Sequence, residues 1–302
     1  MGLVLAAILV VTACGRPPEP VARLVADPRR VELGAGRVAE LALRFEILRP
    51  LDTPARPLVF VHLRSAGGEV VRTFDHPLPA VWDVESVVVD ELRLYHSALG
   101  PPLPPGSYAL TVGIYDGGSR RWALAVEGDE SDRMEYRVAE VVVPEASPVP
   151  VYTFSEGWQS ASRGTDAQVV ARRWLVEDGE ITLSEVPGPG RLWMSIFVPE
   201  PGGRLRLLAE DEATEPAVRV TSGCSGFAAR LAGFGAHEVA VPVTAVDGSC
   251  RVTLDASFHL VEMETLTRRS LALEQLGWEP GTAAAAAAPV PARADATADP
   301  DA

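Results

Sequence analysis

The sequence predicts an all-β fold class, with two tandem antiparallel β-sandwiches. Short segments alternate apolar and polar residues, which is typical of strands with one buried face. Glycine and proline occur 26 times each in the 302 residues, so turns are frequent and long helices are disfavoured. A proline-rich linker, 144–150, divides the pattern into two halves, each long enough for a domain. Short strands between turn signals indicate a sandwich in each half.

In the first half, residues 40–47 alternate most clearly, with Leu41, Leu43 and Phe45 on one face. The other strands predicted in this half, which spans 21–143, are 58–64, 70–74, 86–94, 107–115, 121–126 and 134–143. Residues 101–106 are mostly proline, which cannot donate to a central ladder, so this segment is predicted to be a rigid connector.

The second half, 151–280, has the same turn signals, for example at 187–190 and 200–203. Its predicted strands are 180–183, 191–198, 204–208, 217–221, 226–231, 238–243, 251–256 and 270–278. The last residues, 281–302, are rich in alanine and proline. They cannot build a core, so we expect a disordered tail.

The first residues of the chain, 1–11, form an apolar run that is too short to span a bilayer. The run ends in Val11-Thr12-Ala13-Cys14, and a proline-rich spacer follows up to residue 20. An apolar core followed by small residues indicates a secretory signal peptide, here 1–13. The ending resembles the lipobox of bacterial lipoproteins. That resemblance implies a lipidated Cys14, with the protein exported and anchored to the cell membrane on its extracytoplasmic side. The alternative is a buried strand or helix of a cytoplasmic protein.

The net charge of −14 opposes binding to nucleic acid, because such binding depends on cations that neutralise phosphates. All basic residues apart from histidine are arginine, so Schiff-base and phosphate-loop chemistry through lysine is excluded. The sequence points to no cofactor.

Two further resemblances concern the halves. In the first half the matching motifs are Phe60-Val61-His62-Leu63, Gly67-Gly68-Glu69-Val70-Val71, Asp75-His76-Pro77, Trp82, Leu103-Pro104-Pro105-Gly106-Ser107-Tyr108 and Val112-Gly113-Ile114-Tyr115-Asp116. They resemble soluble domains of membrane glycosyltransferases of the mannosyltransferase type and the carbohydrate-binding domain of O-antigen ABC transporters. This resemblance implies an immunoglobulin-like sandwich.

In the second half the matching features are Gly157-Trp158, Arg173-Trp174, Ser257-Phe258, Arg268-Arg269, Leu276 and Trp278. They resemble jelly-roll domains that accompany bacterial glycosyltransferases, which implies a jelly-roll-like second sandwich.

Cys224 and Cys250 remain as an even pair once Cys14 carries lipid, and disulfides persist in exported proteins. A bridge across this loop would stabilise the fold by about 3 kcal/mol in the chain-entropy model. The alternative is two buried free thiols.

No catalytic constellation and no metal site emerge from the sequence. His62, Asp75 and His76 lie on adjoining strands of one predicted hairpin. They form either a hydrogen-bond network that fixes the hairpin end or, alternatively, a metal site. The acidic segment 127–132 is a solvated turn or a calcium-binding turn, although it lacks a complete loop signature.

The candidate ligand-binding residues are Trp158, Trp174, Arg172 and Arg173, with Trp193 as a further aromatic. An aromatic ring can stack on the apolar face of a sugar while arginine binds its hydroxyls. The alternative is that these tryptophans belong to the core.

The expected function is therefore that of a non-enzymatic cell-envelope lipoprotein that binds or presents glycan. The alternative is a structural accessory subunit that docks on a membrane glycosyltransferase or exporter.

Overall fold

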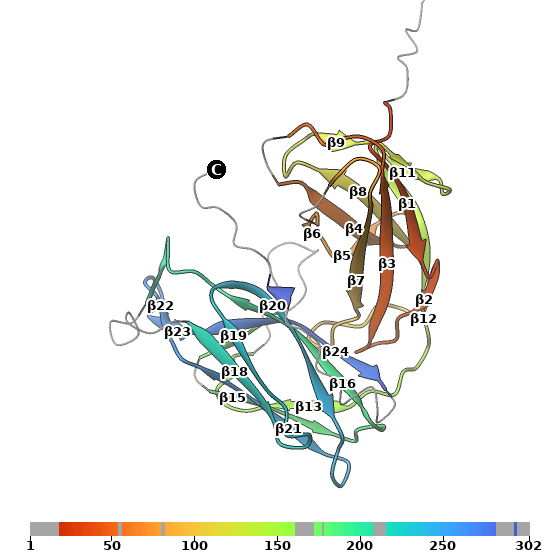
Figure 1. Cartoon of the computed structure of the whole chain (residues 1–302). Coiled ribbons are helices and arrows are strands. Elements are labelled where there is room, and N and C mark those ends of the chain that lie inside the picture. The colour runs from red at the N-terminus through yellow and green to blue at the C-terminus, as the bar shows by residue number, and fades with distance from the viewer. Residues whose placement is uncertain are drawn as a thin grey trace, which may run out of the picture.

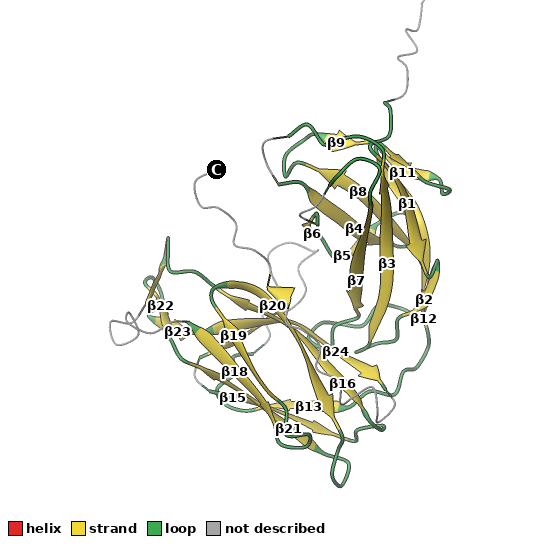
Figure 2. Cartoon of the chain, in the orientation of Figure 1, coloured by secondary structure: helices red, strands yellow, loops and turns green. Residues whose placement is uncertain are grey.

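The computed structural model describes residues 18–53, 56–79, 82–160, 172–176, 178–207 and 216–281, and the backbone strand Arg293–Ala294. Throughout this part of the chain the secondary structure is strand and loop, with no helix (Figure 2), which confirms the all-β prediction. Accordingly, none of the described residues forms a helix that could cross a membrane. The predicted signal peptide, Cys14 and most of the predicted tail lie outside the described residues.

The first sandwich consists of two sheets. One has the order β10 (Leu124–Ala125), β1 (Ala22–Asp27), β3 (Val38–Ile47), β7 (Val87–Tyr95). The other has the order β11 (Glu130–Asp132), β12 (Glu135–Val143), β8 (Gly106–Tyr115), β4 (Leu58–Arg64), β5 (Val70–Thr73). Three short strands pair alongside it, β2 (Arg30–Glu32) with β12, β6 (His76–Pro77) with β4 and β9 (Arg121–Trp122) with β8.

The period-two pattern of the sequence selects the inner faces of this sandwich. Along β3, Leu41, Leu43 and Phe45 are buried, as their alternation predicts. They share one core with Leu110 and Val112 of β8 in the other sheet. Burying a side chain of this size contributes about 1.5–3 kcal/mol, so the alternation fixes both register and face.

The predicted strand 121–126 is wrong as a single element. It divides at Ala123 into β9 and β10, which belong to different sheets. Trp122 pairs with Ile114 of β8, whereas Leu124 pairs in parallel with Ala22 of β1. The chain changes sheets here because both large side chains are then buried in the core between the sheets.

The second sandwich also has two main sheets. One has the order β13 (Val151–Phe154), β15 (Gly179–Ser184), β21 (Cys250–Ala256), β18 (Ala217–Ser222), β19 (Ala228–Ala232). The other has the order β14 (Arg173–Leu175), β24 (Leu271–Pro280), β16 (Gly190–Val198), β20 (Gly235–Val243), β25 (Arg293–Ala294). A small third sheet contains β17 (Leu205–Leu207), β22 (Leu260–Glu262) and β23 (Thr267–Arg269).

The sequence pattern did not predict β22 and β23, since three residues are too few to show a period. The predicted disulfide is confirmed: Cys224 and Cys250 are bonded, with 5.4 Å between their Cα atoms. The bond ties the turn after β18 to the start of β21, inside the second sandwich.

The two sandwiches follow one another along the chain (Figure 1), and main-chain hydrogen bonds, apolar contacts and the bonds of Arg93 and Tyr95 to Glu238 join them. The Ala98 amide donates to the Leu276 carbonyl and the Trp278 amide to the Gly36 carbonyl, each at 2.8 Å. A small apolar cluster fills the junction; it comprises Val38, Tyr95, Trp193 and Ala240. A side chain at Gly277 would collide with Val38, so glycine permits this close approach.

Candidate functional site

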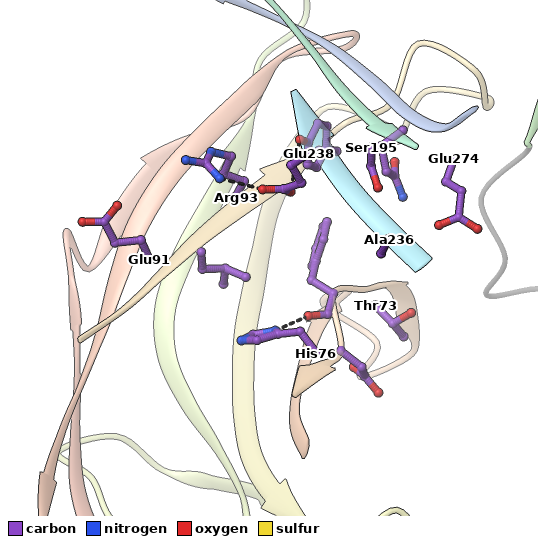
Figure 3. A pocket seen from close by; sticks show the side chains of 13 residues that line it. Thr73, His76, Glu91, Arg93, Ser195, Ala236, Glu238 and Glu274 are labelled. Carbon is purple, nitrogen blue, oxygen red and sulfur yellow. Dashed lines mark hydrogen bonds and ion pairs between the residues drawn. The ribbon is translucent and has the colours of Figure 1, made fainter. Parts of the chain in front are cut away.

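A cavity of about 330 Å³ lies between the two sandwiches, at the lower end of the range of about 300–1,000 Å³ for small-molecule sites. We call it the inter-sandwich cleft. Its lining residues are Thr73, Phe74, Asp75, His76, Glu91, Leu92, Arg93, Tyr95, Ser195, Ala236, Glu238, Glu274 and Gln275. Figure 3 shows Arg93 and His76 of the first sandwich, and Glu238, Ser195 and Glu274 of the second, around the same space.

Strand β7 supplies much of the cleft because it is the edge strand of its sheet. Its alternation buries Leu92 and Leu94 toward the core of the first sandwich. The intervening Arg93 and Tyr95 instead contact the second sandwich. An edge strand thus gives one face to its own core and the other to the neighbouring sandwich.

Arg93 links the two walls of the cleft. Its Nη1 donates to Glu238 Oε2 at 2.6 Å, and its Nε donates to Glu40 Oε1 at 3.0 Å. The guanidinium also lies 4.0 Å from the centre of the Trp193 ring. Burial lowers the pKa of Arg93, but Glu238 and Glu40 outweigh burial, so that the pKa is raised. The Tyr95 hydroxyl donates to the other oxygen of Glu238 at 3.3 Å.

The predicted polar cluster is divided between the cleft and the face of β4 that points away from the first core, opposite the buried Val61 and Leu63. His76 lines the cleft; its Nε2 lies 2.6 Å from Asp90 Oδ2 and its Nδ1 lies 2.8 Å from the Phe74 carbonyl. Asp75 also lines the cleft and accepts a hydrogen bond from the Val61 amide at 3.1 Å. These contacts tie the hairpin end to Asp90 of β7 and to Val61 of β4.

His62, the third member, is not among the cleft-lining residues. Its Nε2 is 3.8 Å from Asp75, and its Nδ1 is 3.2 Å from the buried carboxylate of Glu135. In the described part of the chain, no group of three or more histidine, cysteine or acidic side chains is arranged to hold a metal ion.

Glu135 is the centre of a network that the sequence did not reveal. Arg64 donates to both of its oxygens, at 2.6 and 2.8 Å, and Thr111 also donates to it. Burial alone raises the pKa of Glu135, but the hydrogen bonds from His62, Arg64 and Thr111 outweigh burial and hold the pKa far below its usual range. The only sequence signal was a glutamate at the start of a strand that is otherwise largely apolar.

Trp158, one of the ligand-binding candidates, occupies a buried position. Trp158 is only 6 % exposed and packs edge-on against Phe154 in the core of the second sandwich. Its backbone bridges to Leu175 of β14, which draws the loop onto the sheet and buries the ring. Trp193 is buried as well, at the junction of the sandwiches. These rings therefore present no open face to a ligand.

The other ligand candidates, which are consecutive in the sequence, each have a different partner. Trp174 is half-buried beneath the guanidinium of Arg269, at 4.6 Å, and Arg173 lies 4.2 Å over Phe154. Arg172 alone connects with the cleft, because its Nη2 is 2.6 Å from Glu274 Oε1.

The cleft is rich in hydrogen-bond acceptors. Burial raises the pKa of Asp75 and of Glu274, and nearby hydrogen-bonding or cationic groups only partly offset it. The side-chain oxygen of Gln275 is buried and receives no hydrogen bond from the described residues. Sequence reasoning did not find this site, because its residues come from strands up to about two hundred positions apart.

Comparison with known proteins yields no family. No family model matches the chain, and no curated protein matches it. Among solved structures, two forms of Salmonella alpha-2-macroglobulin, one a mutant and one reacted with methylamine, align at 16 % identity with TM-scores of 0.22. The alignments cover 91 % and 86 % of this chain but only 16 % and 15 % of those proteins. At such TM-scores the similarity carries no argument about function.

Proposed function

We propose that this protein is a non-enzymatic, lipid-anchored protein of the bacterial cell envelope that binds glycan in the inter-sandwich cleft. The observation that carries the proposal is the cleft itself. It combines a volume suited to a small ligand or a terminal sugar with polar groups from both sandwiches. Carboxylates can accept hydrogen bonds from sugar hydroxyls, and Phe74 and Leu92 add apolar surface.

Membrane attachment through Cys14 is consistent with this location of the cleft. Strand β1 begins at the end of the first sandwich that lies away from the second sandwich (Figure 1). An anchor preceding it would hold the first sandwich near the membrane, and the cleft would lie farther out. The resemblance to soluble domains of mannosyltransferase-type enzymes and of O-antigen transporters supports glycan as the ligand class.

The test is a glycan array with the full chain and a variant whose cleft is blocked. Ala236 is exposed and lines the cleft, so Ala236→Trp would fill it without disturbing the core. Ala228→Trp, on the outer strand β19, is the matched control. We expect the native chain and the control to bind the same glycans and Ala236→Trp to bind none. Equal binding by all three proteins would reject the cleft as the site.

A second candidate function, docking on a membrane glycosyltransferase or exporter, has one specific observation in its favour. Four large apolar side chains are exposed on and beside the edge strand β7; they are Leu48, Val84, Val87 and Val89. If docking is correct, Val89→Arg would abolish copurification with the membrane enzyme, while Val246→Arg, at an exposed turn elsewhere, would not. Failure of the native chain to bind any glycan would favour this function over the first.

A further inference from the structure

The charges of the inter-sandwich cleft are unbalanced. Four carboxylates line it, on Asp75, Glu91, Glu238 and Glu274. One guanidinium, on Arg93, and one imidazole, on His76, are the basic groups among its described lining residues. Negative charge therefore exceeds positive charge even when the imidazole is protonated.

Both basic groups are already engaged with protein acceptors. Arg93 directs Nη1 to Glu238 and Nε to Glu40. His76 has the Asp90 carboxylate at one ring nitrogen and a main-chain carbonyl at the other. An anionic ligand would thus compete with carboxylates already in place, and it would also enter a region of excess negative charge.

The cleft carboxylates also have protein partners, but these partners do not neutralise their combined charge: Asp75 accepts from the uncharged Val61 amide, and Arg93 divides its bonds between Glu238 and Glu40. Gln275 lines the cleft beside Glu274, but its side-chain oxygen is buried and has no hydrogen-bond partner among the described residues. Glu274 is largely buried and has a pKa raised by that burial, although Arg172 lies at 2.6 Å. A cationic group with several donors would offset the excess negative charge of the cleft, and an ammonium group has three donors and no acceptor.

We propose that the cleft binds an amino sugar with a free ammonium group in preference to neutral or acidic sugars. This inference rests on the proposed function, since it names the class of glycan that the same site takes. The ammonium group would lie near Glu274 and Gln275, on neighbouring positions of β24, and the sugar hydroxyls would extend toward Asp75 and Glu91.

The experiment is calorimetric titration of the full chain with three oligosaccharides at about pH 6, where the amine is charged and carboxylates are ionised. They are a glucosamine oligomer with free amines, its fully N-acetylated counterpart and an oligo-uronate. The first two share a backbone and differ in charge. We expect the free-amine oligomer to bind at least about tenfold more tightly than its N-acetylated counterpart, with the ratio falling as salt rises.

Two variants test whether the preference for the free amine arises from the carboxylates of the cleft. Glu274→Gln and Glu91→Gln each remove one cleft carboxylate, and each should reduce the preference for the amine severalfold. Glu264→Gln is the control, because it removes the same charge from an exposed pair with Arg204 outside the cleft. Thermal unfolding of each variant verifies that it is folded.

Equal affinity for the free-amine and N-acetylated oligomers would overturn the inference and leave the proposed function standing, as would tightest binding of the oligo-uronate. Absence of binding by all three, together with an empty glycan array, would overturn both. A preference for the amine that persists in both cleft variants would place its origin outside the cleft and also overturn the inference.

Discussion

The two charged clusters of the molecule, the Glu135 network and the inter-sandwich cleft, use the same residue types in opposite ways. On the sheet face that points away from the first core, Glu135 is buried and receives donors from Arg64, Thr111 and His62. In the cleft, carboxylates outnumber cations and a buried amide oxygen has no donor among the described residues. Satisfied polar groups stabilise a fold, whereas unsatisfied ones around a cavity leave binding capacity for a ligand. The difference teaches that polar content alone does not mark a site; the balance of donors and acceptors does.

The largest effect is expected from breaking the satisfied cluster. Glu135→Ala leaves the mostly buried Arg64 guanidinium with only the more distant carboxylate of Asp132, at 3.9 Å. Removing one partner of such a pair costs about 3–5 kcal/mol. Urea denaturation should show this loss in the free energy of unfolding, and Glu46→Ala, from an exposed pair with Arg23, should cost about 1 kcal/mol or less. A loss as small as that of Glu46→Ala would show that the network is not a stabilising centre.

A smaller loss of stability is expected from a substitution in the cleft, at the hydrogen bonds that connect the two sandwiches. Glu238→Ala removes the acceptor of both Arg93 and Tyr95. Hydrogen bonds to charged groups contribute about 1.5–3 kcal/mol, so the loss of stability should be of that size. The same variant should weaken ligand binding, which Glu135→Ala should not do while the protein is folded. Unfolding and binding should be measured for both variants. The expected result is that Glu238→Ala changes both properties, whereas Glu135→Ala changes only stability.

The glycine at the junction gives a third test. Gly277→Ala places a methyl group against Val38, so the sandwiches must move apart. Overpacking of this kind costs about 1–3 kcal/mol, and we expect the lower half of that range because the junction lies between sandwiches and not inside one core. Amide hydrogen exchange should increase at Ala98 and Trp278, whose main-chain bonds cross the junction, and stay unchanged at β4 and β8. Increased exchange in β4 would indicate that the junction and the first core are one unit.

The smallest effect is expected in the pH dependence of stability. Glu135, from the network, and Glu274, from the cleft, should contribute to it with opposite sign. The pKa of Glu135 is lowered by folding, so its contribution is present at neutral pH and lost as pH falls below about 4.3, the unfolded value. The pKa of Glu274 is raised, so ionisation opposes folding, and stability falls as pH rises through the interval above that same unfolded value. Glu274→Gln should flatten this decline by about 1 kcal/mol or less. Denaturation curves between pH 3 and 7, roughly spanning both carboxyl ranges, provide the measurement; an unchanged profile would contradict the assignment.

The sequence allowed much of the fold to be predicted where the signal is local. The alternation along β3 and β8 identified the strands and their buried faces, because period two is a property of neighbouring residues. It failed at Ala123, where one apolar segment divides between two sheets, and at β22 and β23, which are too short to show alternation. The choice of sheet depends on partners distant in the sequence.

The candidate site was less predictable. Asp75 and His76, which are adjacent in the sequence, were identified because the predicted hairpin places them beside His62. Trp158 appeared to belong to a loop, and only the packing of that loop against β14 and Phe154 buried it. Glu238 and Glu274 carried no signal, since each lies on a mostly apolar strand and nothing in the sequence pairs it with a distant residue.

By itself the sequence determined the all-β class, the faces of the main strands, the pair of cysteines able to bond and an N-terminal pattern typical of a lipoprotein signal. The tertiary structure decided which charged groups are matched and where a cavity remains. The physical reason is the distance along the chain over which each feature is set. Alternation and turn chemistry depend on a few neighbouring residues. The charge balance of the cleft is set only when β7, β20 and β24, from two separately packed sandwiches, come together.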